Sequence, residues 1–257
     1  MSVVSALRLQ ALPGLPMLRP GDDLAALIGD ALDRAGIAPE AGDVLVVAQK
    51  IVSKAEGRIV LLADVEPTAR AVELAARIGK DARLVQVILD ESVRVVRSRP
   101  NLLIMEHRLG FVMANAGVDQ SNVAPADGMA RALLLPVDPD ASAARLRDDL
   151  AARFGVAQGV IVNDSFGRAW RRGTAGVAIG VAGLPALRDL RGAPDLFGRT
   201  LEVSIVGYAD EIAAAASLLQ GQADEGQPVV LVRGLRWRED AGPAAELVRP
   251  AAEDLFR

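Results

Sequence analysis

Cysteine is absent from the 257 residues, and histidine occurs only once, as His107. The lack of cysteine excludes disulfide bonds, thiolate metal sites and a cysteine nucleophile, and the single histidine excludes a metal site with several histidine ligands. Any metal ion bound by this chain is therefore expected to have oxygen ligands, which suits Mg²⁺, Mn²⁺ or Ca²⁺.

Aromatic residues are also scarce, with five Phe, two Trp and one Tyr, so the core must consist mainly of Ala, Val, Leu and Ile. The formal net charge of −4 gives no electrostatic case for binding nucleic acid. No apolar run reaches the ~18 residues of a membrane span, and the N-terminus lacks the pattern of a signal peptide. We therefore expect a cytoplasmic protein with neither a nucleic acid nor a membrane as partner.

Local patterns predict a chain in which helices and strands are mixed. Capping residues and apolar periodicity predict the helices, and short apolar runs predict the strands. The expected helices cover residues 22–35, 68–78, 81–90, 141–154 and 210–220. The expected strands cover residues 3–9, 44–48, 60–65, 93–97, 102–105, 160–162, 201–206 and 228–232.

One polar stretch follows the expected strand 160–162, which we expect to stop abruptly at Asn163 in a glycine-bearing turn. Open α/β proteins tend to bind ligands where buried strands end. Asp164 and Ser165 are adjacent oxygen donors of the kind that a hard divalent cation prefers. The nearby Arg168, Arg171 and Arg172 could contact phosphate or carboxylate groups. The alternative interpretation is a surface turn with solvated arginines.

Three other segments carry candidate residues. Asp119 and Asn122 follow a glycine, and Asp119 together with Asp164 would form an oxygen-only metal site, although turn chemistry also explains Asp119. Lys50 and the pair Ser53-Lys54 follow the buried strand 44–48 and could stabilise a phosphate, although a solvated lysine is the commoner case. The segment 220–226 is a short acidic loop framed by glycines, and a simple helix C-cap at Gly221 is its alternative. Neither a P-loop nor a dinucleotide fingerprint is present.

Taken together, the strings GDVLVVAQKIVSKAEGR, EHRLGFVMANAGVDQSNV, VNDSFGRAWRRG, VAIGVAG and GQADEG resemble the coenzyme F420-0:γ-glutamyl ligase family. The resemblance spans the chain from about Gly14 to Arg257, with the strings in the family's order. It implies a two-part α+β fold that forms an intertwined homodimer, and it suggests the stand-alone form of the ligase. We expect one unit over residues 1–257, with two structural subdomains of interleaved boundaries left open.

The resemblance also implies the reaction, in which GTP drives the addition of L-glutamate to F420-0 through an acyl phosphate, followed by a γ-linked second glutamate. The expected metal is Mn²⁺ or Mg²⁺, with K⁺ as a further candidate, and no catalytic side chain is identified. The implied metal ligands are Asp119, Asp164, Ser165 and Gln222. The implied GTP contacts are Leu15, Pro16, Met17, Leu18, Gln49, Lys50, Lys54, Asn122 and Gly221, although relatives can carry small hydroxyl residues at positions 49 and 50. The alternatives are another metal- and nucleotide-dependent carboxylate–amine ligase and a non-catalytic nucleotide-binding protein.

Overall fold

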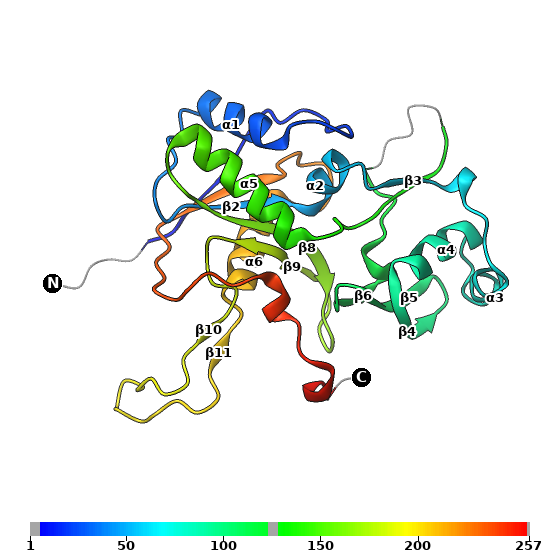
Figure 1. Ribbon diagram of the computed structural model, residues 1–257. Coiled ribbons are helices and arrows are strands. Elements are labelled where there is room, and N and C mark those ends of the chain that lie inside the picture. Colours follow the sequence, from blue (N-terminus) through cyan, green and yellow to red (C-terminus); the bar gives the residue numbers. More distant parts are fainter. Residues whose placement is uncertain (1–5, 123–127, 256–257) are drawn as a thin grey trace.

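The main sheet of the protein has five strands in the order β1-β12-β2-β8-β9 (Figure 1). The computed structural model describes residues 6–122 and 128–255. Strands β2 (Val44–Ala48) and β8 (Gly159–Gly167) pair in parallel, and all other neighbours in this sheet are antiparallel. The remaining strands are β1 (Arg8–Ala11), β12 (Val229–Arg233) and β9 (Thr174–Ala182).

Helices cover both faces of this sheet, which explains why β2 is apolar at successive positions. Leu45 and Val47 pack with α1 (Leu24–Arg34) and α5 (Pro139–Phe154) on one face. Val44 and Val46 point to the opposite face and pack with α6 (Tyr208–Gln220). Each of these valine or leucine side chains contributes roughly 1.5–3 kcal/mol by leaving water. The result is a helix–sheet–helix sandwich.

A second hydrophobic cluster lies between β2 and α5 in sequence and includes Ile88, Leu103 and Met105. It is surrounded by two helices, a three-stranded antiparallel sheet and a separate strand pair, which lie beside the main sheet (Figure 1). These elements are β3 (Ile59–Leu61), α3 (Ala69–Ile78), α4 (Ala82–Asp90), β4 (Ser92–Arg99), β5 (Leu102–His107), β6 (Val112–Ala114) and β7 (Arg131–Leu133). The mixed α+β class is confirmed, whereas the single unit over residues 1–257 stays a prediction.

Two further elements complete the fold. Helix α2 (Gln49–Ala55) continues directly from β2 and lies between the main sheet and the second cluster (Figure 1). Strands β10 (Arg188–Asp189) and β11 (Ile205–Val206) form a narrow arm that projects away from the main sheet. Short 3₁₀ turns cover Leu62–Asp64, Asn115–Gly117, Ala244–Leu247 and Ala251–Glu253. Among residues 6–122 and 128–255, no helix has both the length and the apolar character needed to cross a membrane.

The expected starts of three helices, α1, α3 and α4, agree with the structure. The side chains of Asp23, Thr68 and Asp81 each accept a hydrogen bond from a backbone N–H in the first turn of α1, α3 and α4. Such caps satisfy donors that the helix itself leaves unpaired, and they can be identified from neighbouring residues alone.

Several expected strand boundaries are wrong. Strand β8 does not stop at Asn163, because a β-bulge after Val162 shifts the register and β8 then pairs with β9 as far as Gly167. Only Ile205–Val206 of the expected strand 201–206 pairs, and the expected strand 60–65 ends at Leu61 in a 3₁₀ turn. The expected strand 3–9 begins at Arg8, with residues 3–5 outside the described part of the chain.

Candidate functional site

Several chain segments meet at one edge of the main sheet. Because β2 and β8 are parallel, with Ala48 opposite Asn163, the residues that follow these two positions lie side by side. The loop from α6 returns to β12 at the same edge, where the Ala48 N–H donates a 2.8 Å hydrogen bond to the carbonyl of Pro228. The carboxyl ends of parallel strands are the usual place for a ligand in such sheets.

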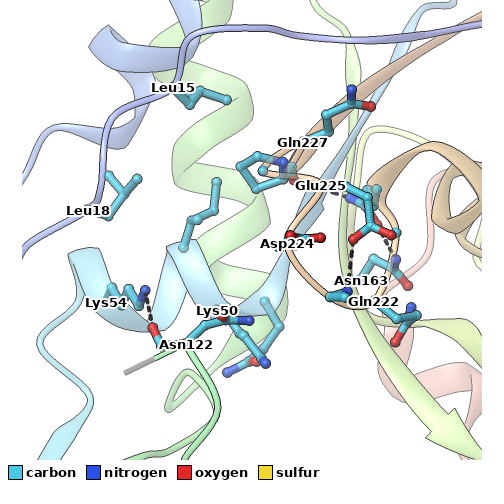
Figure 2. A pocket seen from close by; sticks show the side chains of 18 of the residues that line it. Leu15, Leu18, Lys50, Lys54, Asn122, Asn163, Gln222, Asp224, Glu225 and Gln227 are labelled. Atoms are coloured by element: carbon cyan, nitrogen blue, oxygen red, sulfur yellow. Dashed lines mark hydrogen bonds between the residues drawn. The ribbon is translucent and has the colours of Figure 1, made fainter. Parts of the chain in front are cut away.

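A cavity of about 340 Å³ opens at this edge. Figure 2 shows Leu15 and Leu18 on one side of it, and Asp224, Glu225 and Gln227 of the loop after α6 on the other. Every implied site residue except Asp119 lines this cavity: Leu15, Pro16, Met17, Leu18, Gln49, Lys50, Lys54, Asn122, Asp164, Ser165, Gly221 and Gln222. The structure therefore brings together residues that lie more than 200 positions apart in the chain, from Leu15 to Gln222.

Lys54 is buried in the wall of the cavity on helix α2. Its Nζ atom donates a 2.8 Å hydrogen bond to the backbone carbonyl of Asn122 (Figure 2). Burial and the neighbouring charge of Lys50 lower the pKa of Lys54 from its usual value. Asn122 itself has a left-handed backbone, with φ of 57°, and such strained residues often occur at functional sites.

Asp119 is held by pairing with β7, since its backbone N–H and carbonyl both bond to Leu133. Its Oδ2 atom lies 2.7 Å from Nζ of Lys50 and accepts a 2.8 Å hydrogen bond from the Ser121 hydroxyl. Burial raises the pKa of the Asp119 carboxyl, but the hydrogen bonds from Lys50 and Ser121 outweigh burial and hold the pKa below its usual value. Asp119 is therefore an ionised carboxylate that already has a cation beside it.

The pKa of Asp164 shifts in the opposite direction from that of Asp119. Burial, together with the negative charge of Asp119, raises the pKa of Asp164 from 3.8 to about 6. A buried carboxylate without a compensating charge is stabilised by a nearby cation. The adjacent Ser165 hydroxyl and the Gln222 amide also line the cavity, so the donors here are oxygens that suit Mg²⁺ or Mn²⁺. Within the described residues, no group of three His, Cys, Asp or Glu side chains is placed to hold a metal.

Gln49 and Ser53 serve the structure of helix α2. The Gln49 side chain donates to the Ser53 hydroxyl at 2.6 Å and to the backbone carbonyl of Leu134 at 3.2 Å. Both side chains are buried. The amide hydrogens of Gln49 are thus engaged within the protein, although its side chain borders the cavity.

The loop after α6 is fixed at its base by two amide side chains that the site prediction did not include. Asn163 donates to Oε1 of Gln220 at 2.6 Å and to the Ser217 hydroxyl at 2.9 Å. Gln220 in turn donates to the carbonyls of Val46 and Pro228, both at 3.2 Å. These bonds connect β8, α6, β2 and the start of β12. Only three-dimensional proximity reveals them, because each partner is an ordinary polar residue in the sequence.

The backbone of this loop curves around the side chain of Glu225. The Ala223 N–H donates a 2.8 Å hydrogen bond to the Glu225 carboxylate (Figure 2). Gly221 has a φ of 70°, and a Cβ atom there would collide with that carboxylate. The positive φ therefore favours glycine at position 221, and a larger residue would also displace the Glu225 side chain.

Other residues noted in the sequence lie elsewhere. Arg168, Arg171 and Arg172 are exposed in the turn between β8 and β9 and do not border the cavity. His107 is completely buried, and its Nδ1 atom accepts a 2.9 Å hydrogen bond from the Leu109 N–H, which indicates a structural role. Trp237 packs edge-on against Tyr208.

Comparison with known proteins finds one family, both by a family profile and by individual relatives. The profile of the family described as F420-0:Gamma-glutamyl ligase matches residues 14–234. The chain is 47% identical to the coenzyme F420:L-glutamate ligase of Methanothermobacter thermautotrophicus over 247 residues, covering 95% of this chain and 96% of the relative. It is 46% identical to the protein of that name from Methanopyrus kandleri, with both chains fully covered. It is 44% identical to the Methanocaldococcus jannaschii protein of that name over 218 residues, covering 85% and 86% of the two chains.

Proposed function

The chain belongs to the F420-0:γ-glutamyl ligase family and is a ligase, and from this premise we propose the reaction that it catalyses. It joins L-glutamate to coenzyme F420-0 with GTP as the energy source, and then adds a second glutamate through a γ-linked amide. The observation that carries this proposal is the cavity at the sheet edge, which all but one of the implied GTP and metal residues line.

The cavity has the parts that a nucleotide site needs. Leu15 and Leu18 provide an apolar surface for a base or sugar, and Lys54 provides a positive charge for a phosphate. The loop 221–226 forms the opposite wall, where the side chains of Gln222, Asp224 and Glu225 border the cavity. GTP would therefore lie between helix α2 and this loop.

The proposed chemistry has two steps. The γ-phosphoryl group of GTP passes to an oxygen of the F420-0 carboxylate, and GDP leaves. The glutamate amine then attacks the carbon of this acyl phosphate, the C–O bond breaks, phosphate leaves and the amine loses a proton. No covalent bond to the protein forms, so the side chains act by positioning the reactants and by stabilising charge.

Asp164, Ser165 and Gln222 fit a divalent metal ion. Asp164 lines the cavity as a half-buried carboxyl, and desolvation together with the charge of Asp119 raises its pKa to about 6 despite the opposing charge of Lys50, so a further cation beside it would be favourable. When bound, the metal ion would neutralise phosphate charge and polarise the transferring group. The three residues would hold it with oxygen donors.

We further propose that the protein is a homodimer. The arm between β10 and β11 exposes Leu196 at 99% and Phe197 at 96% of their surface. Val203 on the same arm is 85% exposed. Apolar side chains gathered on one projecting segment are typical of an interaction surface, and a second copy of this chain is the partner that the resemblance implies.

A ligation assay tests the proposed reaction. Purified protein is incubated with F420-0, GTP, L-glutamate and Mn²⁺, and the products are measured by mass spectrometry, with EDTA and ATP as controls. We expect products heavier by one and two glutamyl groups that depend on GTP and metal. The variant Asp164→Ala should lose this activity, whereas Asp148→Ala, at an exposed aspartate on α5, should keep it. A folded protein that binds GTP but adds no glutamate would contradict the assignment.

A further inference from the structure

The turn between β8 and β9 holds an exposed tryptophan. Strand β8 ends at Gly167 and β9 begins at Thr174, and Trp170 lies between them with 88% of its surface exposed. Its backbone has a φ of 64°, in the left-handed region that bulky residues rarely adopt because it costs free energy. An apolar ring that is held in water by a strained backbone is typical of a residue that contacts a ligand or a partner.

Arginine residues flank this tryptophan within the turn. Arg168, Arg171 and Arg172 are all exposed, and within the described part of the chain none of their side chains pairs with a carboxylate. Arg168 donates a 3.3 Å hydrogen bond to the backbone carbonyl of Arg172, across the base of the turn. No Asp or Glu occurs from Ser165 to Arg188 in the sequence. The turn is therefore locally cationic and attracts anions.

Strand β8 connects this turn to the cavity. Asp164 and Ser165 line the cavity and belong to the same strand that ends at the turn. An extended chain rises about 3.3 Å per residue, so Arg168 lies roughly 13 Å beyond Asp164 along the strand. A ligand whose reacting end lies in the cavity can therefore reach the turn if the ligand is elongated.

The proposed acceptor substrate has this shape and this chemistry. F420-0 carries a flat deazaflavin ring and a carboxylate at opposite ends of a ribityl phosphate chain. Its carboxylate has to meet GTP in the cavity, so its ring has to lie further out. An indole packs well against a flat aromatic ring, and guanidinium groups bind phosphate oxygens through paired hydrogen bonds.

We propose that the turn between β8 and β9 binds the outer part of F420-0, with Trp170 against the deazaflavin ring and with Arg171 and Arg172 against the phosphate. This inference rests on the proposed function, because that function supplies F420-0 and requires its carboxylate in the cavity. The turn lies outside the cavity lining and is separate from the residues implied for GTP and metal. It would select a substrate that carries both a flat ring and a phosphate.

Two ligands separate the contact with the ring from the contact with the phosphate. One is F420-0, and the other is the uncharged deazaflavin alcohol, which keeps the ribityl chain but lacks the phosphate and the carboxylate. Binding is followed by the fluorescence anisotropy of the deazaflavin, with Mn²⁺ and the non-hydrolysable analogue guanosine 5′-(β,γ-imido)triphosphate present. The double variant Arg171→Gln/Arg172→Gln should bind F420-0 about 10-fold more weakly and the alcohol less than about 2-fold more weakly. Trp170→Ala should bind both ligands about 10-fold more weakly.

The matched control is the double variant Arg97→Gln/Arg99→Gln, which removes two exposed arginines of β4 and should leave both affinities unchanged. Calorimetry with the GTP analogue should give affinities within about 2-fold of the native value for every variant, which shows that the nucleotide site is intact. The arginine and tryptophan variants are independent, so one of them decides the matter if the other does not fold.

Native affinity for F420-0 in both turn variants would overturn the role of the turn, while glutamate addition by the native chain would still support the proposed reaction. Conversion of the protein to a monomer by either variant, measured by light scattering, would also overturn it and would identify the turn as a contact between copies. A native chain that binds the GTP analogue but not F420-0 would contradict both the role of the turn and the proposed reaction.

Discussion

The side-chain amide of Asn163 donates a 2.6 Å hydrogen bond to Oε1 of Gln220, and this bond joins strand β8 to the last residue of helix α6. Gln220 also donates to the carbonyls of Val46 and Pro228. The Gln220 side chain therefore connects strands β8 and β2 to Pro228, the residue before β12, at the base of the loop that lines the cavity.

Replacing Gln220 with Leu should lower the free energy of unfolding by about 1–3 kcal/mol, because it leaves buried hydrogen-bonding groups without partners. Chemical denaturation measures this change. The matched control is Gln222→Leu, two residues further along, whose exposed side chain should change stability by less than about 0.5 kcal/mol. The control should still weaken Mn²⁺ binding, because Gln222 is a proposed ligand. Equal stability of the two variants would show that the bonds of Gln220 contribute little.

Replacing Asp164 with Asn should stabilise the metal-free protein at neutral pH. The folded-state pKa of about 6 exceeds 3.8, so the folded protein binds the extra proton between these values and loses stability as pH rises through this window. The penalty is at most about 3 kcal/mol and is full above pH ~6, with Lys50 and Asp119 as the charged groups facing Asp164. Thermal melts in EDTA from about pH 4 to pH 8 should show the gain of the variant growing with pH. Added Mn²⁺ should stabilise only the native chain, and a gain that does not depend on pH would contradict this account.

Replacing Lys54 with Met should weaken GTP binding about 10- to 100-fold, because a partly buried ammonium loses its contact with a phosphate. Isothermal titration calorimetry with GTP and Mn²⁺ gives the affinity. Lys80→Met is the matched control, since it removes the same charge just after α3, outside the cavity lining, and should leave affinity unchanged. Equal losses in both variants would indicate a general effect of net charge.

Replacing Leu196 and Phe197 together with Ser should convert the proposed dimer into a monomer. Both side chains are almost fully exposed at the tip of the arm, so the change should not disturb the core. Light scattering coupled to size-exclusion chromatography measures the mass. The control Val72→Ser, at a half-exposed valine on α3, should not alter it. A variant that keeps the native mass would place the interface elsewhere.

Local sequence patterns were sufficient for some elements of the fold. The helix starts near Asp23 and Thr68, the helix over residues 81–90 and the apolar run of β2 depend on neighbouring residues, and the structure confirms them. The sequence predicts strand β8 too short, because its second half depends on pairing with β9 after a bulge. Polar residues such as Asp164 in that half do not show the apolar pattern of a buried strand. Helix α2 was not predicted because it is short and rich in polar residues, and tertiary burial of Ile51 and Val52 stabilises it.

The site likewise combines residues that the sequence predicts with contacts that only the structure reveals. Family resemblance selected residues that line one cavity, although no periodicity or spacing places Leu15 near Gln222. The bond between Asn163 and Gln220 was not predicted, because its partners lie 57 positions apart and neither belongs to a distinctive pattern. The contacts among Lys50, Asp119 and Ser121 likewise depend on the side-by-side placement of helix α2 and a segment about 70 positions further along the chain.

The parallel pairing of β2 with β8 also has a consequence for how the protein folds. Val44 pairs with Gly159, and the intervening chain includes the whole second hydrophobic cluster. Closing such a long loop costs entropy before any contact repays it, and parallel pairing across a large sequence separation is intrinsically slow. The two halves of the cavity edge therefore meet only when the main sheet itself forms. During refolding, nucleotide binding should therefore return in the same kinetic phase as the sheet. Folding intermediates that form earlier should not bind nucleotide.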